Sequence, residues 1–198
     1  PTCAKRVAWG APVVVLVSAS QPLTNGEGHG VLRHNPRPLF LQEVRRQAAL
    51  PGAALGHPRG GSFGPTAKNL QEQHVYVIQS EEGLAKVDEV TPCRFGAPTV
   101  LLVAFNKDDV FTYPGGKRTS GVEDATIVAT HMLLAAANEG VDSCWINKFD
   151  PERACEAFGL PADEDALMFL DLGFAAEGVT PLPNHSRRKE LAETVSYL

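Results

Sequence analysis

The sequence predicts an α+β fold, in which helices and strands alternate irregularly around one core. The chain has 198 residues and 43% hydrophobic content, which suits a single compact domain. Short runs rich in β-branched and aromatic residues alternate with helical patterns, but without the strict repetition of a parallel βαβ sheet. The segment 120–139 is apolar almost all round, so we expect it to be a central, buried helix.

The regular part of the chain begins with a strand, a helix and a second strand. Residues 74–79 (HVYVIQ) and 98–105 (PTVLLVAF) are short and rich in Val, Leu and aromatic residues, as strands are. Residues 81–90 between them fit an amphipathic helix. The expected apolar side of this helix consists of Leu84, Val87 and Val90.

The long helix is bracketed by two end signals. Ser120 and Glu123 have the spacing of a capping box, in which both side chains satisfy free backbone amides. Gly140 follows the last helical residue and is a usual left-handed terminator. The remaining predicted elements are a strand at 142–147, a helix that starts at Asp150-Pro151 and closes at Gly159, and a last core strand at 167–175.

Residues 1–62 differ from the rest in charge and composition. They hold seven basic and two acidic groups, a net charge of +5, whereas the remainder holds 11 basic and 21 acidic groups, a net charge of −10. Seven prolines and eight glycines interrupt helices and strands alike. Only 13–17, as a strand, and 39–50, as a short basic helix, look ordered. We therefore separate an atypical segment 1–62, whose folding stays open, from a main domain at 63–198.

The bulk properties exclude several classes of protein. The net charge of −5 and a pI near 5.7 argue against nucleic-acid binding by the whole protein. No apolar run approaches the roughly 20 residues that span a bilayer, so we expect a soluble, cytoplasmic protein without a membrane partner. The four cysteines lack C-x-x-C spacing and histidine partners, which favours packed, reduced thiols over a metal site.

Searches for common catalytic motifs find nothing convincing. Gly115-Gly116-Lys117 is not a phosphate-binding loop, because Arg118 follows the lysine, and it is better explained as a turn. The triplet 163–165 (Asp-Glu-Asp) is expected to be a solvated acidic turn rather than a metal site. Neither a Rossmann glycine motif nor a nucleophile elbow is present.

A polar loop stands directly before the first strand of the main domain. Residues 64–71 read Gly-Pro-Thr-Ala-Lys-Asn-Leu-Gln and gather a rigid proline, a hydroxyl, two amides and a cation. Polar loops before strands are common, but such a loop can also offer donors to a planar heterocycle such as a flavin ring. The loop resembles the proline–hydroxyl–small–x–Asn–x–Gln signature of the FMN-dependent nitroreductase family.

The resemblance continues in family order and covers about 135 residues, from 64 to 198. Each segment is short, so the ordered set carries the resemblance. The further matching segments are 93–98, 133–140, 143–147, 149–151, 171–175, 187–189 and 193–198.

The resemblance implies a three-layer, nitroreductase-like fold with a central, mainly antiparallel sheet flanked by helices. It further implies a homodimer with FMN at the subunit interface and a C-terminal arm that reaches the partner subunit. In the loop, it implies hydrogen bonds from Thr66 and Asn69, backbone contacts from Pro65 and Ala67, and a further contact from Gln71.

Two later segments complete the implied cofactor site. Cys144, Trp145 and Ile146 match the stretch that lies against the flavin ring, with Cys144 as a packing residue rather than a redox thiol. Arg187 or Arg188 matches the basic group that pairs with the FMN phosphate, where a guanidinium fork suits two phosphate oxygens.

The implied reaction is hydride transfer from NADH or NADPH to flavin N5, followed by ping-pong reduction of a nitroaromatic, a quinone or a similar electron-poor acceptor. The flavin performs the redox chemistry, so no catalytic side chain and no metal are expected. The sequence indicates neither the physiological acceptor nor a preference between NADH and NADPH.

The N-terminal segment departs from the family pattern. Family members begin with a helix whose Arg-x-Ser-x-Arg motif holds the phosphate, and residues 1–62 contain no match, because Arg45 and Arg46 are adjacent and lack the serine. A divergent N-terminus, a rearranged one and an upstream change of reading frame stay open. One alternative is therefore a catalytically impaired flavin-binding or dimeric scaffold. A basic anchor for nucleic acid is weakly supported, since no aromatic residues interleave the arginines.

Overall fold

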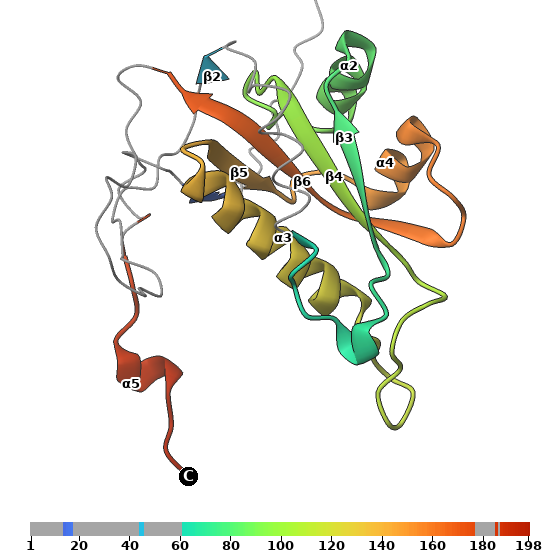
Figure 1. The fold of residues 1–198 in the computed structure, drawn as a ribbon, viewed down its shortest axis with the longest axis vertical. Helices are drawn as coiled ribbons and strands as arrows, with labels where there is room; N and C mark the ends of the chain where they lie inside the picture. The colour runs from blue at the N-terminus through green and yellow to red at the C-terminus, as the bar shows by residue number, and fades with distance from the viewer. Residues whose placement is uncertain (1–13, 18–43, 46–60, 177–184, 186) are drawn as a thin grey trace, which may run out of the picture.

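The computed structural model describes residues 14–17, 44–45, 61–176, 185 and 187–198. Within this part of the chain, six strands form one antiparallel sheet in the order β1-β5-β6-β4-β3, and β2 pairs with the end of β6 (Figure 1). The strands are β1 Val14–Val17, β2 Val44–Arg45, β3 Gln73–Ile78, β4 Thr99–Asn106, β5 Asp142–Ile146 and β6 Glu164–Ala175.

Helices cover both faces of the sheet and produce three layers (Figure 1). The longest helix, α3, packs on one face against Leu101, Val103 and Leu170. Helices α2 and α4 pack on the other face, where Leu102 and Phe169 are fully buried. The helices are α2 Glu81–Val90, α3 Gly121–Asn138, α4 Pro151–Phe158 and α5 Leu191–Thr194, with a 3-10 turn, η1, at Ala67–Asn69.

Strand β4 is central because its side chains, which point alternately to the two faces of the sheet, are apolar on both faces. Its residues from Thr99 to Phe105 are all buried, because α3 covers one set of side chains and α2 and α4 cover the other. Burying one such large apolar side chain contributes about 1.5–3 kcal/mol relative to leaving it exposed. The predicted α+β architecture with a mainly antiparallel sheet is therefore confirmed.

Most predicted elements are confirmed within one or two residues. The helix predicted at 81–90 is α2, and it begins with the Ser80 hydroxyl accepting the Gly83 N–H at 3.1 Å. Helix α4 begins at an Asp150 cap and ends at Gly159 in the left-handed conformation, as predicted. Gly140 likewise ends α3 with φ of 79°. The Gly115-Gly116 turn is also confirmed, with positive φ at both glycines.

Two predictions for α3 are wrong in detail. The capping box is absent, because the Ser120 hydroxyl accepts the Phe111 N–H at 3.2 Å and Glu123 binds Tyr113 and Arg118 instead. Within one chain, α3 is also not buried on all sides, since Val122 and Leu134 are exposed. One face of α3 packs on the sheet, and its outer face carries apolar side chains without cover from the described residues.

Two further predictions need correction. The prediction of a helix at 39–50 is wrong at the centre of this range, because Val44 and Arg45 form β2 and pair with Ala175 and Phe174. The triplet 163–165 is not simply a solvated turn, because Glu164 opens β6 with its side chain largely buried. The rest of 39–50 and most of segment 1–62 lie outside the described residues, so the division at residue 62 stays a prediction.

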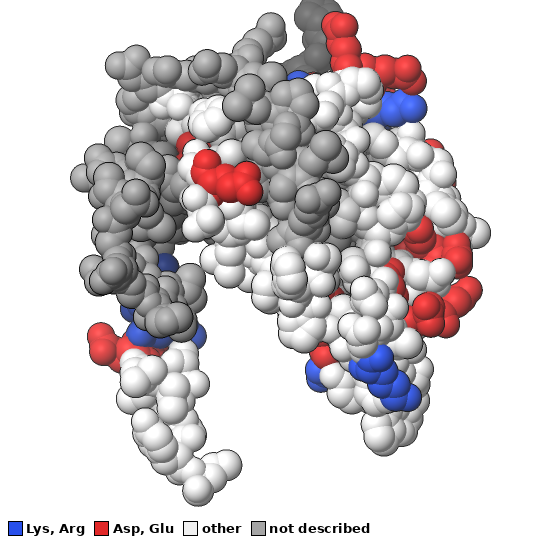
Figure 2. Space-filling view, in the orientation of Figure 1, with Lys and Arg blue, Asp and Glu red and all other residues white. Residues whose placement is uncertain are grey.

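The described surface carries dispersed charge. Figure 2 shows carboxylates scattered over one face, and the Lys and Arg side chains drawn there form no continuous patch. Among the described residues, no helix combines the length and the apolar character required to cross a membrane.

Candidate cofactor site

The loop 65–71 has an unusual backbone for residues other than glycine. Lys68, Asn69 and Gln71 all adopt left-handed conformations, with φ of 53°, 57° and 56°. Such conformations are rare for these residue types and persist where surrounding contacts hold them. Inside the loop, the Gln71 N–H donates to the Thr66 hydroxyl oxygen at 3.1 Å, and the Asn69 N–H donates to the Thr66 carbonyl at 2.9 Å.

The loop lies against the first turns of α3 (Figure 1). The Ala67 N–H donates to Asp124 Oδ1 at 3.0 Å. Before the loop, Gly64 approaches α3 so closely that an added Cβ would stand 3.2 Å from Val128 Cα. These contacts turn the side chains of Lys68, Asn69 and Gln71 outward, where all three are exposed.

A buried carboxyl pair lies beneath the loop. Glu72 and Asp124 are each only 5% exposed, and Ser120 Oγ lies 3.5 Å from Glu72 Oε1. Burial and, next, a hydrogen bond with Asp124 raise the pKa of Glu72 to about 7. Neither residue was predicted as part of the site. The only sequence signals were a glutamate directly after the loop and an acidic pair in the first turn of a helix.

The predicted ring-facing stretch, Cys144 to Ile146, lies inside β5. Cys144 and Ile146 are each 1% exposed, and β5 pairs with β6 on one side and β1 on the other. Burial, and then the charge of Asp171, raise the pKa of the Cys144 thiol. Cys144 lies in the buried core cluster, as a packing residue would, and its role at a flavin ring stays a prediction. Only Trp145 is partly exposed, and its indole N–H donates to Asn147 Oδ1.

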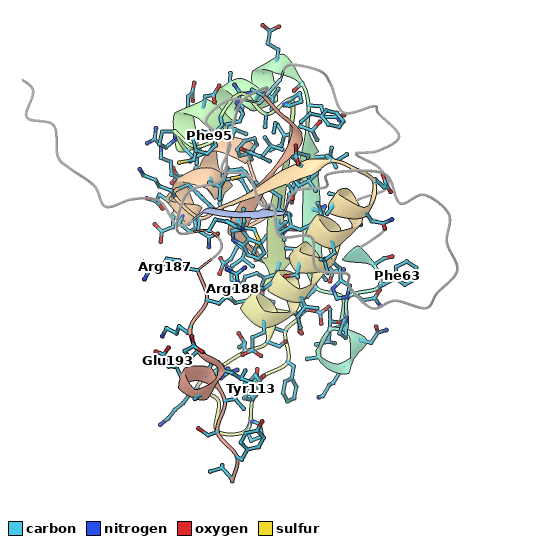
Figure 3. All side chains as sticks on the ribbon, turned by 90° about the vertical axis from the view of Figure 1, so that its left-hand side faces the viewer. Phe63, Phe95, Tyr113, Arg187, Arg188 and Glu193 are labelled. Atoms are coloured by element: carbon cyan, nitrogen blue, oxygen red, sulfur yellow. The ribbon has the colours of Figure 1, made fainter. Side chains whose placement is uncertain are left out.

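The predicted phosphate-binding arginines lie apart from the loop within one chain. Arg187 and Arg188 are exposed, and among the described residues Arg188 donates to the carbonyl oxygens of His185 and Arg187 alone. In Figure 3, Arg187 lies on the opposite side of the view from Phe63, which precedes the loop, and Arg188 lies between them. In the described part of one chain, no contact joins them to residues 65–71.

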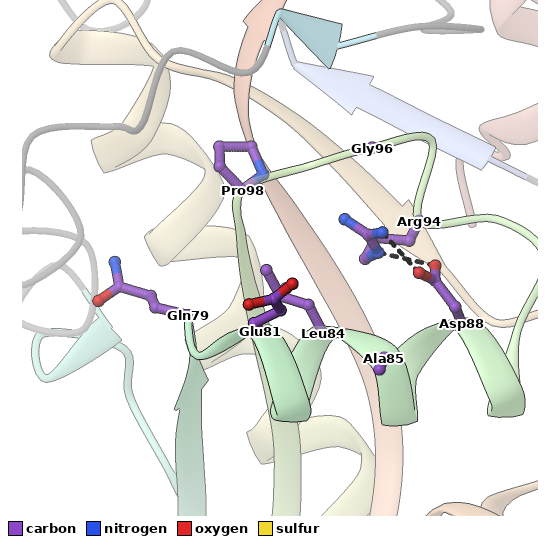
Figure 4. A pocket seen from close by; sticks show the side chains of 8 residues that line it. All are labelled: Gln79, Glu81, Leu84, Ala85, Asp88, Arg94, Gly96 and Pro98. Carbon is purple, nitrogen blue, oxygen red and sulfur yellow. Dashed lines mark hydrogen bonds and ion pairs between the residues drawn. The ribbon is translucent and has the colours of Figure 1, made fainter.

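A separate open groove of about 540 Å³ lies between α2 and the turn before β4 (Figure 4). Its main charged feature is Arg94, whose Nε donates to Asp88 Oδ1 at 2.7 Å and whose Nη1 donates to the Ala97 carbonyl at 2.9 Å. None of the predicted site residues lines it. Because Asp88 already neutralises Arg94, the described residues that line the groove offer no free cation to attract an anion.

The donors of the loop fit the edge of a flavin ring. The Thr66 oxygen accepts from Gln71, which leaves its hydroxyl hydrogen free to donate. The exposed Asn69 amide offers both a donor and an acceptor. Ala67 fits less well than predicted, because its N–H is bonded to Asp124 and its carbonyl accepts from Leu70 at 3.2 Å.

Comparison with known proteins extends this description. Residues 92–174 match the model of the Nitroreductase family. A relative from Methanothermobacter thermautotrophicus is 28% identical over 123 residues, which are 58% of this chain and 61% of that protein. Its name gives NADH dehydrogenase/NAD(P)H nitroreductase as a candidate activity. The match thus spans about three-fifths of the length of this relative.

Solved structures share the fold. A nitroreductase family protein from Clostridium difficile 630 superposes with a TM-score of 0.75 at 28% identity, covering 82% of this chain and 94% of that one. A nitroreductase in complex with FMN from Exiguobacterium sibiricum 255-15 superposes with a TM-score of 0.71 at 16% identity, with the same coverage. The chain therefore has the nitroreductase fold, and its segment 92–174 is similar to the Nitroreductase family.

Proposed function

We propose that the protein is an FMN-dependent NAD(P)H oxidoreductase that reduces nitroaromatics, quinones or similar electron-poor acceptors. The observation that carries the proposal is the loop 65–71, which a chain of nitroreductase fold holds in a left-handed geometry with the Asn69 amide exposed. When bound, FMN would supply hydride-transfer chemistry in a ping-pong sequence with NADH or NADPH. The protein's own contribution is binding, orientation and exclusion of water.

The roles of the loop residues follow from their free groups. Thr66 would donate its hydroxyl hydrogen, and Asn69 would form paired hydrogen bonds to the polar edge of the ring. Pro65 would offer its carbonyl, and Gln71 its exposed side-chain amide, whose Nε2 also donates to the Asn69 carbonyl at 3.4 Å. Ala67 would contribute packing and the second lone pair of its carbonyl, because its N–H already serves Asp124.

The remaining contacts come from the sheet and from the C-terminal arm. The backbone of Cys144, Trp145 and Ile146 would lie against the ring, with the Trp145 indole as the one partly exposed side chain. Arg187 or Arg188 would pair with the phosphate. Because the arginines do not meet the loop within one chain, this assignment requires a second subunit.

We infer a homodimer from apolar side chains that one chain leaves uncovered. The arm 187–198 projects from the body of the molecule (Figure 1), and it carries large apolar side chains: Leu191 is 68% exposed and Tyr197 is 92% exposed. Val122 and Leu134 on the outer face of α3 are exposed as well. Large apolar side chains left exposed in this way are typical of an interface, and a partner subunit would bury them.

Cofactor titration and turnover test the proposal. The purified full chain is titrated with FMN by visible absorbance and fluorescence, and NADH and NADPH oxidation is followed with a quinone. Asn69→Ala should weaken FMN binding roughly five- to a hundredfold, because two hydrogen bonds of about 0.5–1.5 kcal/mol each are lost. Asn138→Ala, at an exposed asparagine near the end of α3, is the matched control and should leave binding unchanged. A protein that binds no added FMN overturns the proposal.

A second candidate is a nitroreductase-like scaffold with impaired turnover. The specific observation in its favour is the separation of Arg187 and Arg188 from the loop within one chain. Loss of one charge-assisted phosphate contact costs roughly 1.5–3 kcal/mol, or about ten- to a hundredfold in affinity. Dimer formation and FMN binding without NAD(P)H oxidation would favour the scaffold over the enzyme.

A further inference from the structure

We propose that Glu72 and Asp124 share one proton beneath the loop 65–71, and that this proton sets the geometry in which the loop meets its cofactor. Both would be positioning residues, because they act through the loop backbone and not on a substrate. The inference rests on the proposed function only for the role of the loop in the FMN site.

The geometry supports a shared proton. Asp124 Oδ1 is occupied by the Ala67 N–H, and Glu72 Oε1 lies within reach of the Ser120 hydroxyl. The other two oxygens, Glu72 Oε2 and Asp124 Oδ2, are buried and have no hydrogen-bond donor among the described residues. Two buried carboxylates in contact repel each other, and one proton between them both removes a charge and satisfies both oxygens.

The direction of titration is consistent with this arrangement. Burial raises the pKa of Glu72 first, the hydrogen bond and the charge of Asp124 raise it further, and hydrogen bonds from its own backbone and Ser120 oppose the rise. The resulting pKa of about 7 means that the pair holds its proton below neutral pH and loses it above.

The other titratable groups around the pair are engaged elsewhere. Among the described residues, no lysine, arginine or histidine is hydrogen-bonded or ion-paired with either carboxyl group, so a proton is the available means of offsetting the second charge. The surrounding groups are Lys68 over the Phe111 ring, Glu123 with Tyr113 and Arg118, and His74 with Glu164.

Loss of the proton would act on the loop through Asp124. Above neutral pH, two negative charges at 5% exposure would separate or draw in water. The bond from the Ala67 N–H to Asp124 would then loosen. The left-handed conformations of Lys68 and Asn69 depend on such contacts, so the outward presentation of the Asn69 amide would change.

The test follows the loop and the cofactor separately. In the full chain, the backbone amide resonance of Ala67 is recorded from about pH 5.5 to about pH 9, and FMN affinity is measured over the same range. Glu72→Gln keeps the size of the side chain and removes its titration. Glu123→Gln is the matched control, because Glu123 is a neighbour of Asp124 on the same helical turn but binds Tyr113 and Arg118.

In the wild-type chain, the Ala67 resonance should titrate near neutral pH, and FMN binding should weaken roughly tenfold between about pH 6 and about pH 8.5. Glu72→Gln should abolish both effects, and Glu123→Gln should preserve them. A resonance that does not titrate, or that titrates equally in Glu72→Gln, overturns the inference. If the resonance titrates as expected but no variant binds FMN, the shared proton stands and the proposed function fails.

Discussion

Glu164 accepts the hydroxyl of Tyr76 at 2.6 Å and thereby joins β3 to β6 across the strand that separates them. The same carboxylate lies 2.7 Å from His74 Nδ1, and its side chain is only 10% exposed. Burial, followed by the hydrogen bond to Glu164, raises the pKa of Tyr76. The tyrosine therefore remains a hydrogen-bond donor throughout the ordinary pH range.

Removal of this hydroxyl should destabilise the sheet. We expect Tyr76→Phe to lower the free energy of unfolding by about 1–2 kcal/mol, because a largely buried carboxylate loses one of its two partners. Tyr113→Phe is the control. Tyr113 lies before α3, and its hydroxyl bonds to Glu123, which is more exposed than Glu164. Urea denaturation measures both variants. Equal losses would contradict a special role for the Tyr76–Glu164 bond.

Asp171 should make stability depend on pH. Both of its carboxylate oxygens are buried without a hydrogen-bond partner among the described residues, and burial raises its pKa well above the ordinary value, against the opposing charge of Arg94. A raised folded pKa adds stability that is complete below the unfolded pKa of about 4 and is lost as pH rises toward the folded pKa. Stability should therefore fall as the pH rises above about 4, and melting temperatures at about pH 5 and about pH 9 measure the fall.

Asp171→Asn isolates this contribution, because the amide is neutral at every pH. The variant should show a smaller fall in melting temperature between the same two pH values than the wild-type chain. Asp165→Asn, at a half-exposed carboxylate that pairs with Lys107, should follow the wild type. Parallel curves for the wild type and Asp171→Asn would show that Asp171 is already ionised in the folded protein.

Arg94 should not be replaceable by lysine. Its guanidinium group binds both oxygens of Asp88 and the Ala97 carbonyl, and it is only 18% exposed. Lysine keeps the charge but cannot form these three bonds together, so Arg94→Lys should cost about 1–3 kcal/mol.

The control for Arg94 is the exposed pair of Lys86 and Glu82, one helical turn apart at 3.4 Å. Lys86→Ala should change stability by less than about 0.5 kcal/mol, as exposed pairs usually do. Thermal and chemical denaturation of both variants provide the comparison. An Arg94→Lys variant as stable as the wild type would mean that charge alone matters at this position.

The regular elements could be predicted because their signals are local. Apolar spacing identified α2 residue for residue, and Asp150 with Gly159 fixed both ends of α4. The cap of α3 could not be predicted in the same way. Ser120 has the right spacing for a capping box, but the Phe111 N–H, brought close by the intervening hairpin, takes its hydroxyl instead.

The candidate site was less accessible from sequence. The loop 65–71 was found through its family resemblance, but left-handed backbone at Lys68 and Asn69 follows from contacts with α3 and leaves no mark in the residue types. Glu72 and Asp124 are 52 positions apart, so only the folded chain brings their carboxyl groups together. Within one chain Arg187 forms no described contact with the loop, and the sequence of one chain does not indicate whether a second subunit would bring the two together.

The substitution Gly121→Ala tests how tightly α3 packs at its first residue. A Cβ at this position would overlap the Phe105 ring, which belongs to the buried part of β4, and would stand 2.9 Å from Val110 Cγ1. Gly121→Ala should therefore cost about 1–3 kcal/mol through overpacking, although alanine is otherwise the better helix former. Thr130→Ala, at an exposed site whose hydroxyl donates back to the Thr126 carbonyl, should be neutral or slightly stabilising.

Because the clash lies next to Ser120 and Asp124, Gly121→Ala should also shift the Ala67 amide resonance, whereas Thr130→Ala should not. A Gly121→Ala protein with unchanged melting temperature would show that the start of α3 moves freely, and the loop beneath which Asp124 lies would then have no rigid support.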